Sequence, residues 1–380
     1  MVIKRHTRLQ RLAHDEDGFS LVFVGLGFMA FLAVSMLAID VGMLMTARSQ
    51  AQNSADAGAL AGATALVYND WDNRSASGPA VTNALGAARG NQVMAGTVSV
   101  TPTDVTFPLD PDGLNDRVKV NVFRNASRGN PISTLIAQYF GIATVGVDAT
   151  ATAEASPADA MTCVLPFTIP DRWIEKQTPP FDPDDGYASG DVYIGPMDKA
   201  NYTGYDPERD KGMLVRLKAD NNTKLAPSFY YPYAVPGSTG ASDYRWNIGN
   251  CNTNIMRFGE IYNPEPGNMV GPTQQGMGDL IALDPAAYWD TATNKVVSQY
   301  TPSPRVRAIP LFDPDYYFNG KMNGRNASLK FVNYLGFFIE EMQGNEVVGR
   351  ITPIGGLRKG GAGAEGVPPA AFPRVIRLVQ

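Results

Sequence analysis

The sequence predicts an α+β protein that an N-terminal helix anchors in a membrane. Three observations carry this prediction: an uncharged apolar run near the N-terminus, a proline-free helical stretch after it, and alternating strand-like segments further along. The single-pass transmembrane helix is expected to extend into a pilin-like α+β domain, followed by a mainly β, irregular domain. The expected divisions are a cytoplasmic stub at 1–18, a transmembrane helix at 19–45, a helix plus α+β domain at 46–156 and a β-rich domain at 157–380.

Composition and charge narrow the class of protein. The length of 380 residues suggests two or three domains. With 44% hydrophobic and 18% charged residues, the chain is typical of a globular protein with some membrane character. The net charge of -5 argues against a nucleic-acid surface, so no nucleic-acid partner is expected.

The uncharged run from Phe19 to Ile39 predicts the transmembrane helix. Its 21 residues would span roughly 30 Å as a helix, which is the thickness of a bilayer core. The alternative is a cleavable signal peptide, whose apolar region is usually about 7–15 residues long and ends at a small-x-small cut site. The run is longer than that and continues into helix-forming sequence, so we expect an uncleaved anchor.

The distribution of basic residues predicts the orientation of this anchor. The next basic residue after the run is Arg48, whereas four precede it: Lys4, Arg5, Arg8 and Arg11. The positive-inside rule therefore places the N-terminus in the cytoplasm and everything beyond about residue 41 outside the cytoplasmic membrane. Asp40 then lies at the far interface, where a charge costs less than at mid-bilayer. We interpret this membrane-boundary acid as a cap or polar anchor; a functional intramembrane acid is the alternative.

The stretch after the membrane run predicts a continued helix with one smooth face. No proline precedes Pro79, although the chain has 28, and an interior proline would break a helix. Residues four apart share a helix face, and small side chains let another backbone approach closely. The face is expected to pack on the protein's own domain; the alternative is a homo-oligomer through the Ala47–Ala63 stripe. The stripe consists of Ala47, Ala51, Ala55, Ala59 and Ala63, with Ser54, Gly58 and Gly62 beside it.

Hydrophobic periodicity predicts the remaining elements of the first domain. A second helix is expected over about 81–92, with Pro79 in its first turn. Alternating residues favour strands over 96–107, 116–124 and 145–155, with a short amphipathic helix over 130–141 between the last two. Beyond a boundary at 156–159, the chain becomes rich in Pro, Gly, Asn, Asp and Tyr. This composition predicts short strands with long loops, a helix at Thr273–Leu283 capped by Thr273, and a last strand at 374–379.

The two cysteines, Cys163 and Cys251, both lie in the exported part. Such a pair in an oxidising compartment predicts a disulfide; two unrelated buried thiols are the alternative. A closed loop of this length would stabilise the fold by about 4–5 kcal/mol in the chain-entropy model.

The exported part carries no catalytic motif. The two histidines, His6 and His14, fall in the stub, which excludes a Ser-His-Asp triad, a Cys-His pair and a histidine-ligated zinc site. A two-carboxylate glycosidase or a Ser-Lys pair remains formally open, but no motif supports either. We therefore expect no enzyme, no catalytic residue and no cofactor.

Three further patterns each have a plain structural alternative. Two groups of acidic residues could bind calcium, because carboxylate oxygens are the hard ligands that this ion prefers. They lack the EF-hand spacing, and ordinary turns are the favoured interpretation. The segment 266–276 could hold an anion at a helix start, although a structural turn is favoured. A group of aromatic residues could form a recognition surface or a core. The acidic groups are Asp182, Asp184, Asp185 and Asp191, and Asp110, Asp112 and Asp116; the aromatic residues are Tyr230, Tyr231, Tyr233, Tyr316, Tyr317 and Phe318.

Residues 15–68 resemble a known family. The features that carry the resemblance are the Gly18 junction before the apolar run, the AIDVG sequence at Ala38–Gly42, and RSQAQNSADAGALAGATAL at Arg48–Leu66. They resemble the TadE/TadG-like family of Flp pilus assembly, from the tight-adherence (Tad) systems of bacteria. The resemblance implies a bitopic envelope protein whose partners are the cytoplasmic membrane and Tad/Flp pilus or envelope proteins. It carries over no catalytic residue.

One position departs from that family's processed members. Phe23 stands where processed prepilin-like members have a glutamate, which is thought to pair with a neighbour's N-terminal amine during pilus packing. We expect a membrane-anchored structural or assembly component of a Tad (Flp) pilus or secretion system. A surface adhesin or ligand-binding ectodomain displayed by that machinery is the alternative, and a periplasmic enzyme is the weakest one.

Overall fold

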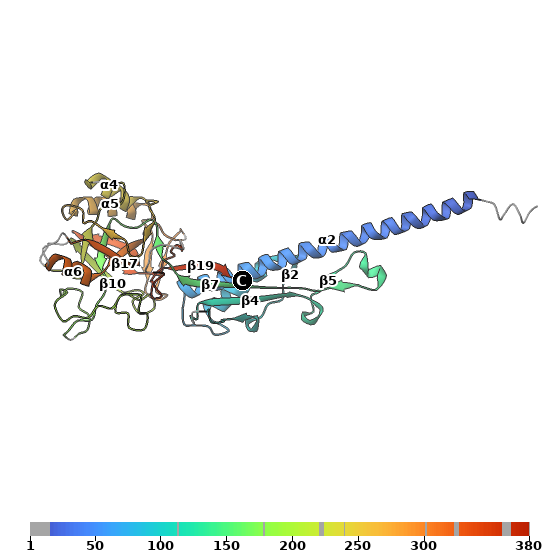
Figure 1. The fold of residues 1–380 in the computed structure, drawn as a ribbon, viewed down its shortest axis with the longest axis horizontal. Helices are drawn as coiled ribbons and strands as arrows, with labels where there is room; N and C mark the ends of the chain where they lie inside the picture. Colours follow the sequence, from blue (N-terminus) through green and yellow to red (C-terminus); the bar gives the residue numbers. More distant parts are fainter. Residues whose placement is uncertain are drawn as a thin grey trace, which may run out of the picture.

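The computed structural model describes residues 16–111, 114–177, 179–219, 224–238, 240–300, 302–322, 327–358 and 366–379. Most of the expected stub, including both histidines, lies outside these residues, as does Asp112. Figure 1 shows a long helix that projects from a small sheet, with a rounded β-rich body at the opposite end. The two parts are described in turn as the N-terminal unit and the barrel unit.

Helix α2, Glu16–Tyr68, is continuous over 53 residues. It confirms the expected extension of the apolar run into the helical stretch behind it. Within the described residues, α2 is the helix that is long and apolar enough to cross a membrane. Helix α3, Pro79–Gly90, begins at the expected proline, because a proline in the first turn has no intrahelical N–H bond to lose.

A four-stranded antiparallel sheet completes the N-terminal unit. Its order is β19-β7-β4-β3, and α2 packs along β7 and β4. The strands are β3 Val105–Thr106, β4 Arg117–Arg124, β7 Val147–Pro157 and β19 Arg374–Val379. In β4, Val118, Val120 and Val122 are buried and their neighbours are partly exposed, which is the pattern of a half-covered strand.

The last strand does not belong to the domain expected at 157–380. All of β19 pairs with β7, from Arg374 opposite Pro157 to Val379 opposite Thr152. The barrel unit is therefore inserted between two neighbouring strands of the N-terminal sheet. A linear boundary cannot anticipate this, because strand pairing depends on the path of the whole intervening chain.

Two expected elements of the N-terminal unit are wrong. The strand over 96–107 is divided into β2 Gly96–Thr97, a 3-10 helix Pro102–Asp104 and β3, because a capping box between Thr101 and Asp104 turns the chain. The helix over 130–141 is instead a hairpin of β5 Ile132–Ser133 and β6 Thr144–Val145 with a 3-10 turn, Ala137–Phe140, at its end. Two shorter elements complete this unit: β1 Gln92–Val93, which pairs with β2, and a 3-10 helix at Ala126–Arg128.

The β-rich region has a closed core rather than an irregular one. Six strands follow one another as β17-β16-β9-β11-β10-β18, and β18 pairs again with β17, so the sheet closes into a barrel. A barrel this small is filled by side chains. The strands are β9 Phe167–Pro170, β10 Leu214–Ala219, β11 Phe229–Pro232, β16 Val306–Phe312, β17 Leu329–Gln343 and β18 Glu346–Ile351.

Helices and short hairpins cover this barrel. Its α4 Gly240–Gly249 packs on α5 Val270–Ala282, and α5 contacts β17. Helix α5 begins three residues before the expected cap: Thr273 is buried inside it, and Met269 occupies the N-cap with a positive φ of 46°. The remaining elements are β8 Ala160–Met161, β12 Met256–Arg257, β13 Ile261–Tyr262, β14 Tyr288–Asp290, β15 Lys295–Val297 and α6 Pro314–Met322.

Candidate functional site at the membrane boundary

The exposure of α2 changes abruptly near residue 45. Apolar side chains from Leu21 to Ile39 are largely exposed, including Phe28 at 61% and Val34 at 69%. From Ala47 onward, one face of the same helix is fully buried in the N-terminal unit. An apolar surface exposed on every side is expected of a helix surrounded by lipid. The transition between about Asp40 and Ala47 is therefore the boundary between the exposed apolar part of α2, which is long and apolar enough to cross a membrane, and its packed part.

Asp40 lies at this boundary and binds a distant loop. Its carboxylate accepts hydrogen bonds from three successive backbone N–H groups, those of Leu135 (2.8 Å), Ile136 (2.9 Å) and Ala137 (2.6 Å). The residue is only 7% exposed. Because Ala137 begins a 3-10 helix, Asp40 supplies a cap to donors that have no partner within that turn. Asp40 thus caps a turn of a distant loop rather than an end of its own helix, which continues to Tyr68.

The alanine stripe packs inside the N-terminal unit, as the favoured interpretation expected. All five alanines are at most 1% exposed, and they share a core with α3 and the valines of β4. Ser54 donates a hydrogen bond to the Ala88 carbonyl of α3 (2.8 Å). A Cβ at Gly62 would lie 2.7 Å from Cγ1 of Val118, so the glycine is required for this approach. The Ala47–Ala63 stripe is therefore not available to a second chain, and the homo-oligomer alternative through it is wrong.

The two cysteines are joined by a disulfide in the structure. Cys163 and Cys251 have Cα atoms 4.3 Å apart. The backbone N–H of Cys163 also donates to the carbonyl of Asn252 (3.0 Å). The bond ties the chain entering the barrel unit to the segment that follows α4.

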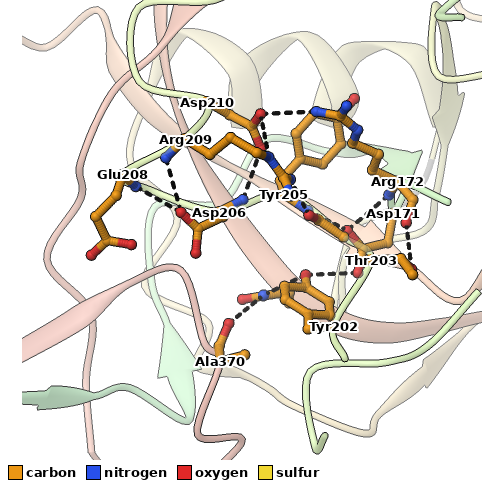
Figure 2. Close-up of polar contacts among 12 residues, drawn as sticks. Asp171, Arg172, Tyr202, Thr203, Tyr205, Asp206, Glu208, Arg209, Asp210 and Ala370 are labelled. Carbon is orange, nitrogen blue, oxygen red and sulfur yellow. Dashed lines mark hydrogen bonds and ion pairs between the residues drawn. The ribbon is translucent and has the colours of Figure 1, made fainter. Parts of the chain in front are cut away.

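Figure 2 shows a buried polar network in the barrel unit that sequence reasoning missed. One carboxylate oxygen of Asp171 accepts from the N–H groups of Arg172 (2.9 Å) and Tyr205 (3.1 Å). The other accepts from the hydroxyls of Tyr193 (3.1 Å) and Tyr202 (2.8 Å). Burial raises the pKa of Asp171 to about 6, although these four hydrogen bonds oppose the rise.

The Asp171 network is suited to holding structure rather than to chemistry. Four donors use the acceptor capacity of a carboxylate, so none remains for a substrate. Nearby, Asp210 accepts from the guanidinium groups of Arg172 (2.9 Å) and Arg209 (2.7 Å). Asp171 and Tyr202 are 31 residues apart, so no local motif could have indicated that they meet.

A cavity of about 200 Å³ lies where the two units meet. Its lining includes Trp71 from the loop after α2 and Arg374 at the start of β19, with Glu208 and Lys211 from the barrel unit. Burial, followed by the charge of nearby Asp206, raises the pKa of Glu208 to about 7. The guanidinium of Arg374 stacks over the ring of Trp71, with 4.9 Å between Cζ and the ring centroid. The junction thus combines charged groups with an aromatic contact, and it packs the two units together.

Most of the candidate calcium ligands accept backbone hydrogen bonds, and Asp110 does so from the N–H of Leu114 (2.6 Å). Asp116 differs, because its carboxylate is buried and has no hydrogen-bond partner among the described residues. Asp182 accepts from the N–H of Asp184, Asp185 from Gly186, and Asp191 from Lys176 and Ala188, as expected of ordinary turns. Among the described residues, no group of three or more His, Cys, Asp or Glu side chains is arranged to hold a metal ion.

Most of the grouped aromatic residues form core rather than a recognition surface. Tyr230, Tyr231, Tyr233 and Tyr317 are buried, and three of them contribute to one aromatic core cluster beside the barrel. Tyr316 is the exposed member of the group at 42%, while Phe318 packs partly buried against the same cluster. Apart from Tyr316, these rings are therefore core residues: Tyr317 of α6 packs its ring against those of Tyr231 and Phe312 in the barrel strands.

Comparison with known proteins finds a match in the N-terminal part of the chain. Residues 18–65 match the Tad family of Flp pilus-assembly, TadE/G-like proteins. The match confirms the resemblance expected from the sequence, and it covers the stretch of α2 that contains the apolar run, Asp40 and the alanine stripe. No curated protein and no solved structure matches the chain.

Proposed function

We propose that the chain is a membrane-anchored structural or assembly component of a bacterial Tad (Flp) pilus or secretion system. Its anchor lies in the cell inner membrane with the N-terminus in the cytoplasm, and both folded units work in the periplasm. The helix crossing the sheet of the N-terminal unit supports a pilin-like build for that unit. The proposed role is non-catalytic, and the saturated carboxylate of Asp171 supports this view.

The observation that carries the proposal is the continuity of α2 through the matched segment. The first part of the helix is apolar and exposed, and the second part packs one face into the N-terminal unit. No break separates the two parts. A rigid connection of this kind sets the height and direction of the ectodomain above the membrane. It would hold the exported surface where envelope or pilus subunits assemble.

Phe23 supports a role beside the fibre rather than within it. The phenyl ring has no charge to pair with an N-terminal amine, and it is 60% exposed on the apolar part of α2. We therefore propose that the anchor is retained. N-terminal sequencing of the mature protein should return Met1 or Val2, whereas a mature end at Phe19 would overturn the retained anchor.

Release of the ectodomain tests whether anchoring matters. A deletion strain would be complemented with the full chain or with a variant that carries a signal-peptidase site inserted after Met45. The control carries the same insertion with its cleavage site inactivated. We expect pili, counted by electron microscopy, with the full chain and the control but not with the cleaved variant. Normal pili from the released ectodomain would contradict the proposal.

The same strains separate the adhesin alternative. An adhesin displayed by the machinery would leave pilus number unchanged in the deletion strain while surface attachment is lost. Digestion of the ectodomain by protease added to spheroplasts, but not to intact cells, would support the proposed orientation. Protection of the ectodomain in spheroplasts would contradict it.

A further inference from the structure

The hairpin end at 135–142, here called the apolar loop, exposes an unusual set of side chains. Leu135 and Ile142 are each 53% exposed, Tyr139 is 81% and Phe140 is 73% exposed. From Gly129 to Val147 the sequence contains no Asp, Glu, Lys or Arg. Large apolar side chains grouped on a loop without charges indicate a surface that a membrane or another protein covers.

Asp40 fixes the height of the apolar loop along α2. Its three hydrogen bonds hold the backbone at 135–137 directly beside the end of the apolar run. In Figure 1 the β5 hairpin lies alongside α2 and reaches toward the exposed part of that helix, away from the barrel. The exposed side chains of the loop are therefore at the level where α2 enters the membrane.

The backbone of the apolar loop is largely satisfied without water. Besides the three N–H groups bound by Asp40, those of Tyr139, Gly141 and Ile142 donate to loop carbonyls at 3.0–3.1 Å. The Thr134 hydroxyl donates to the carbonyl of Ile142 (2.6 Å). Internal pairing of this kind is what a segment needs when it enters a lipid environment, since an unpaired backbone group there costs several kcal/mol.

We propose that the apolar loop inserts into the headgroup region of the bilayer that α2 crosses, as a second membrane contact. The expected depth is about 5–10 Å, to the boundary between headgroups and acyl chains. Tyrosine suits this level because its ring is apolar and its hydroxyl reaches water. Two contacts, a helix and a loop braced on Asp40, fix the tilt of the ectodomain as a single transmembrane helix cannot.

A lipid surface is the occupant that the arrangement favours. The exposed apolar surface of α2 ends at about Met45. The apolar loop lies beside the end of that surface, because Asp40 holds its backbone there. Once α2 spans a bilayer, lipid is necessarily present there, whereas a protein partner would have to be recruited. The inference rests on the proposed anchoring by α2, so its test includes a separate probe of that anchor.

The test measures the depth of a fluorophore in vesicles. Full-length protein would be reconstituted in vesicles of phosphatidylethanolamine and phosphatidylglycerol and labelled with NBD at single introduced cysteines. The native cysteines are bonded to each other, so only the introduced thiol reacts. The variants are Phe140→Cys and Tyr139→Cys in the loop, Val34→Cys in the anchor, and Tyr288→Cys as the control. Tyr288 is 57% exposed but lies on the barrel unit.

We expect lipids that carry a nitroxide near the headgroup to quench both loop probes, and lipids with a deep nitroxide to quench Val34→Cys. The control should respond to neither. Quenching at Val34→Cys without quenching at the loop would overturn this inference alone. Absence of quenching at Val34→Cys would overturn the anchor and the inference together. A third outcome would also overturn the proposal: the loop probes show blue-shifted emission without quenching, and unlabelled Phe140→Cys protein forms disulfide-linked dimers. That result would show that a second copy of the chain, and not lipid, covers the loop.

Discussion

The two units of the molecule are held together by different kinds of core. Of the twelve largest fully buried side chains among the described residues, eleven lie between Phe167 and Phe372, and the remaining one is Leu66. The core of the N-terminal unit is built mainly from alanine and valine. The first unit thus relies on close backbone approach, and the second on interlocked rings and branched side chains.

This difference predicts opposite sensitivities. Close helix–sheet contact leaves no room for added atoms, so the N-terminal unit should tolerate enlargement poorly. The barrel unit should instead suffer most from truncation, because removing a ring leaves a cavity. The four predictions below test or refine this contrast, in descending order of expected effect.

The largest effect is expected from Phe337→Ala. Phe337 is fully buried in the barrel interior, and its loss should destabilise the barrel unit by about 3–5 kcal/mol. Urea unfolding in mild detergent, followed by the fluorescence of buried Trp173, measures the change. The matched control is Tyr288→Ala, where the ring is mostly exposed. Similar losses from both substitutions would show that ring packing does not hold the barrel.

The second prediction concerns the pH dependence of the barrel unit. Because the pKa of Asp171 is raised to about 6 from an ordinary value near 3.8, the folded state binds more protons at this site than the unfolded state. Stability contributed by the protonated form is therefore present below about pH 4 and is lost as pH rises to about 6. The loss should approach about 3 kcal/mol. Asp171→Asn should remove this slope, because a neutral amide does not titrate.

Urea unfolding of the wild type and Asp171→Asn at several pH values measures this slope. The difference between the two proteins isolates Asp171 from other groups, such as Glu175, whose pKa is raised to about 7 by burial. Parallel stability curves from pH 4 to 7 would contradict the assignment of the slope to Asp171.

The third prediction tests the close contact of the N-terminal unit. Gly62→Ala should destabilise it by about 1–2 kcal/mol, since the new methyl would meet Val118 and the overpacking exceeds the gain in helix propensity. Gly86→Ala on α3 is the matched control, because a Cβ there meets nothing within 4 Å. That substitution should stabilise the unit by up to about 1 kcal/mol. Thermal unfolding in detergent compares the two, and equal effects would refute the packing argument.

The smallest and most local effect is expected from Asp40→Asn. An amide presents one acceptor oxygen where the carboxylate presents two, so the backbone at 135–137 should exchange hydrogen faster while the barrel is unaffected. Hydrogen exchange read by mass spectrometry measures this, with Asp56→Asn on the same helix as the control. Unchanged protection at 135–137 would show that Asp40 does not brace the loop.

The sequence alone determined the features that depend on local pattern. Residues 19–68 read as one helix because apolar length, absence of proline and i+4 spacing are properties of neighbouring residues. The same is true of α3, with its proline in the first turn, and of β4, with its alternating valines. The matched family pattern at 18–65 is also contiguous, so it was visible without a fold.

Tertiary structure decided what depends on residues distant in sequence. Closure of the barrel, the return of β19 to β7 and the four donors around Asp171 join residues far apart in the sequence. The ion pair of Arg377 with Glu154 (2.6 Å), for example, spans 223 residues. Asp40 could be recognised as a boundary acid from its place after the apolar run. That its carboxylate holds a loop 95 residues away followed only from the fold. Strand pairing is set by the whole chain, and a local pattern carries no information about which partner a strand will take.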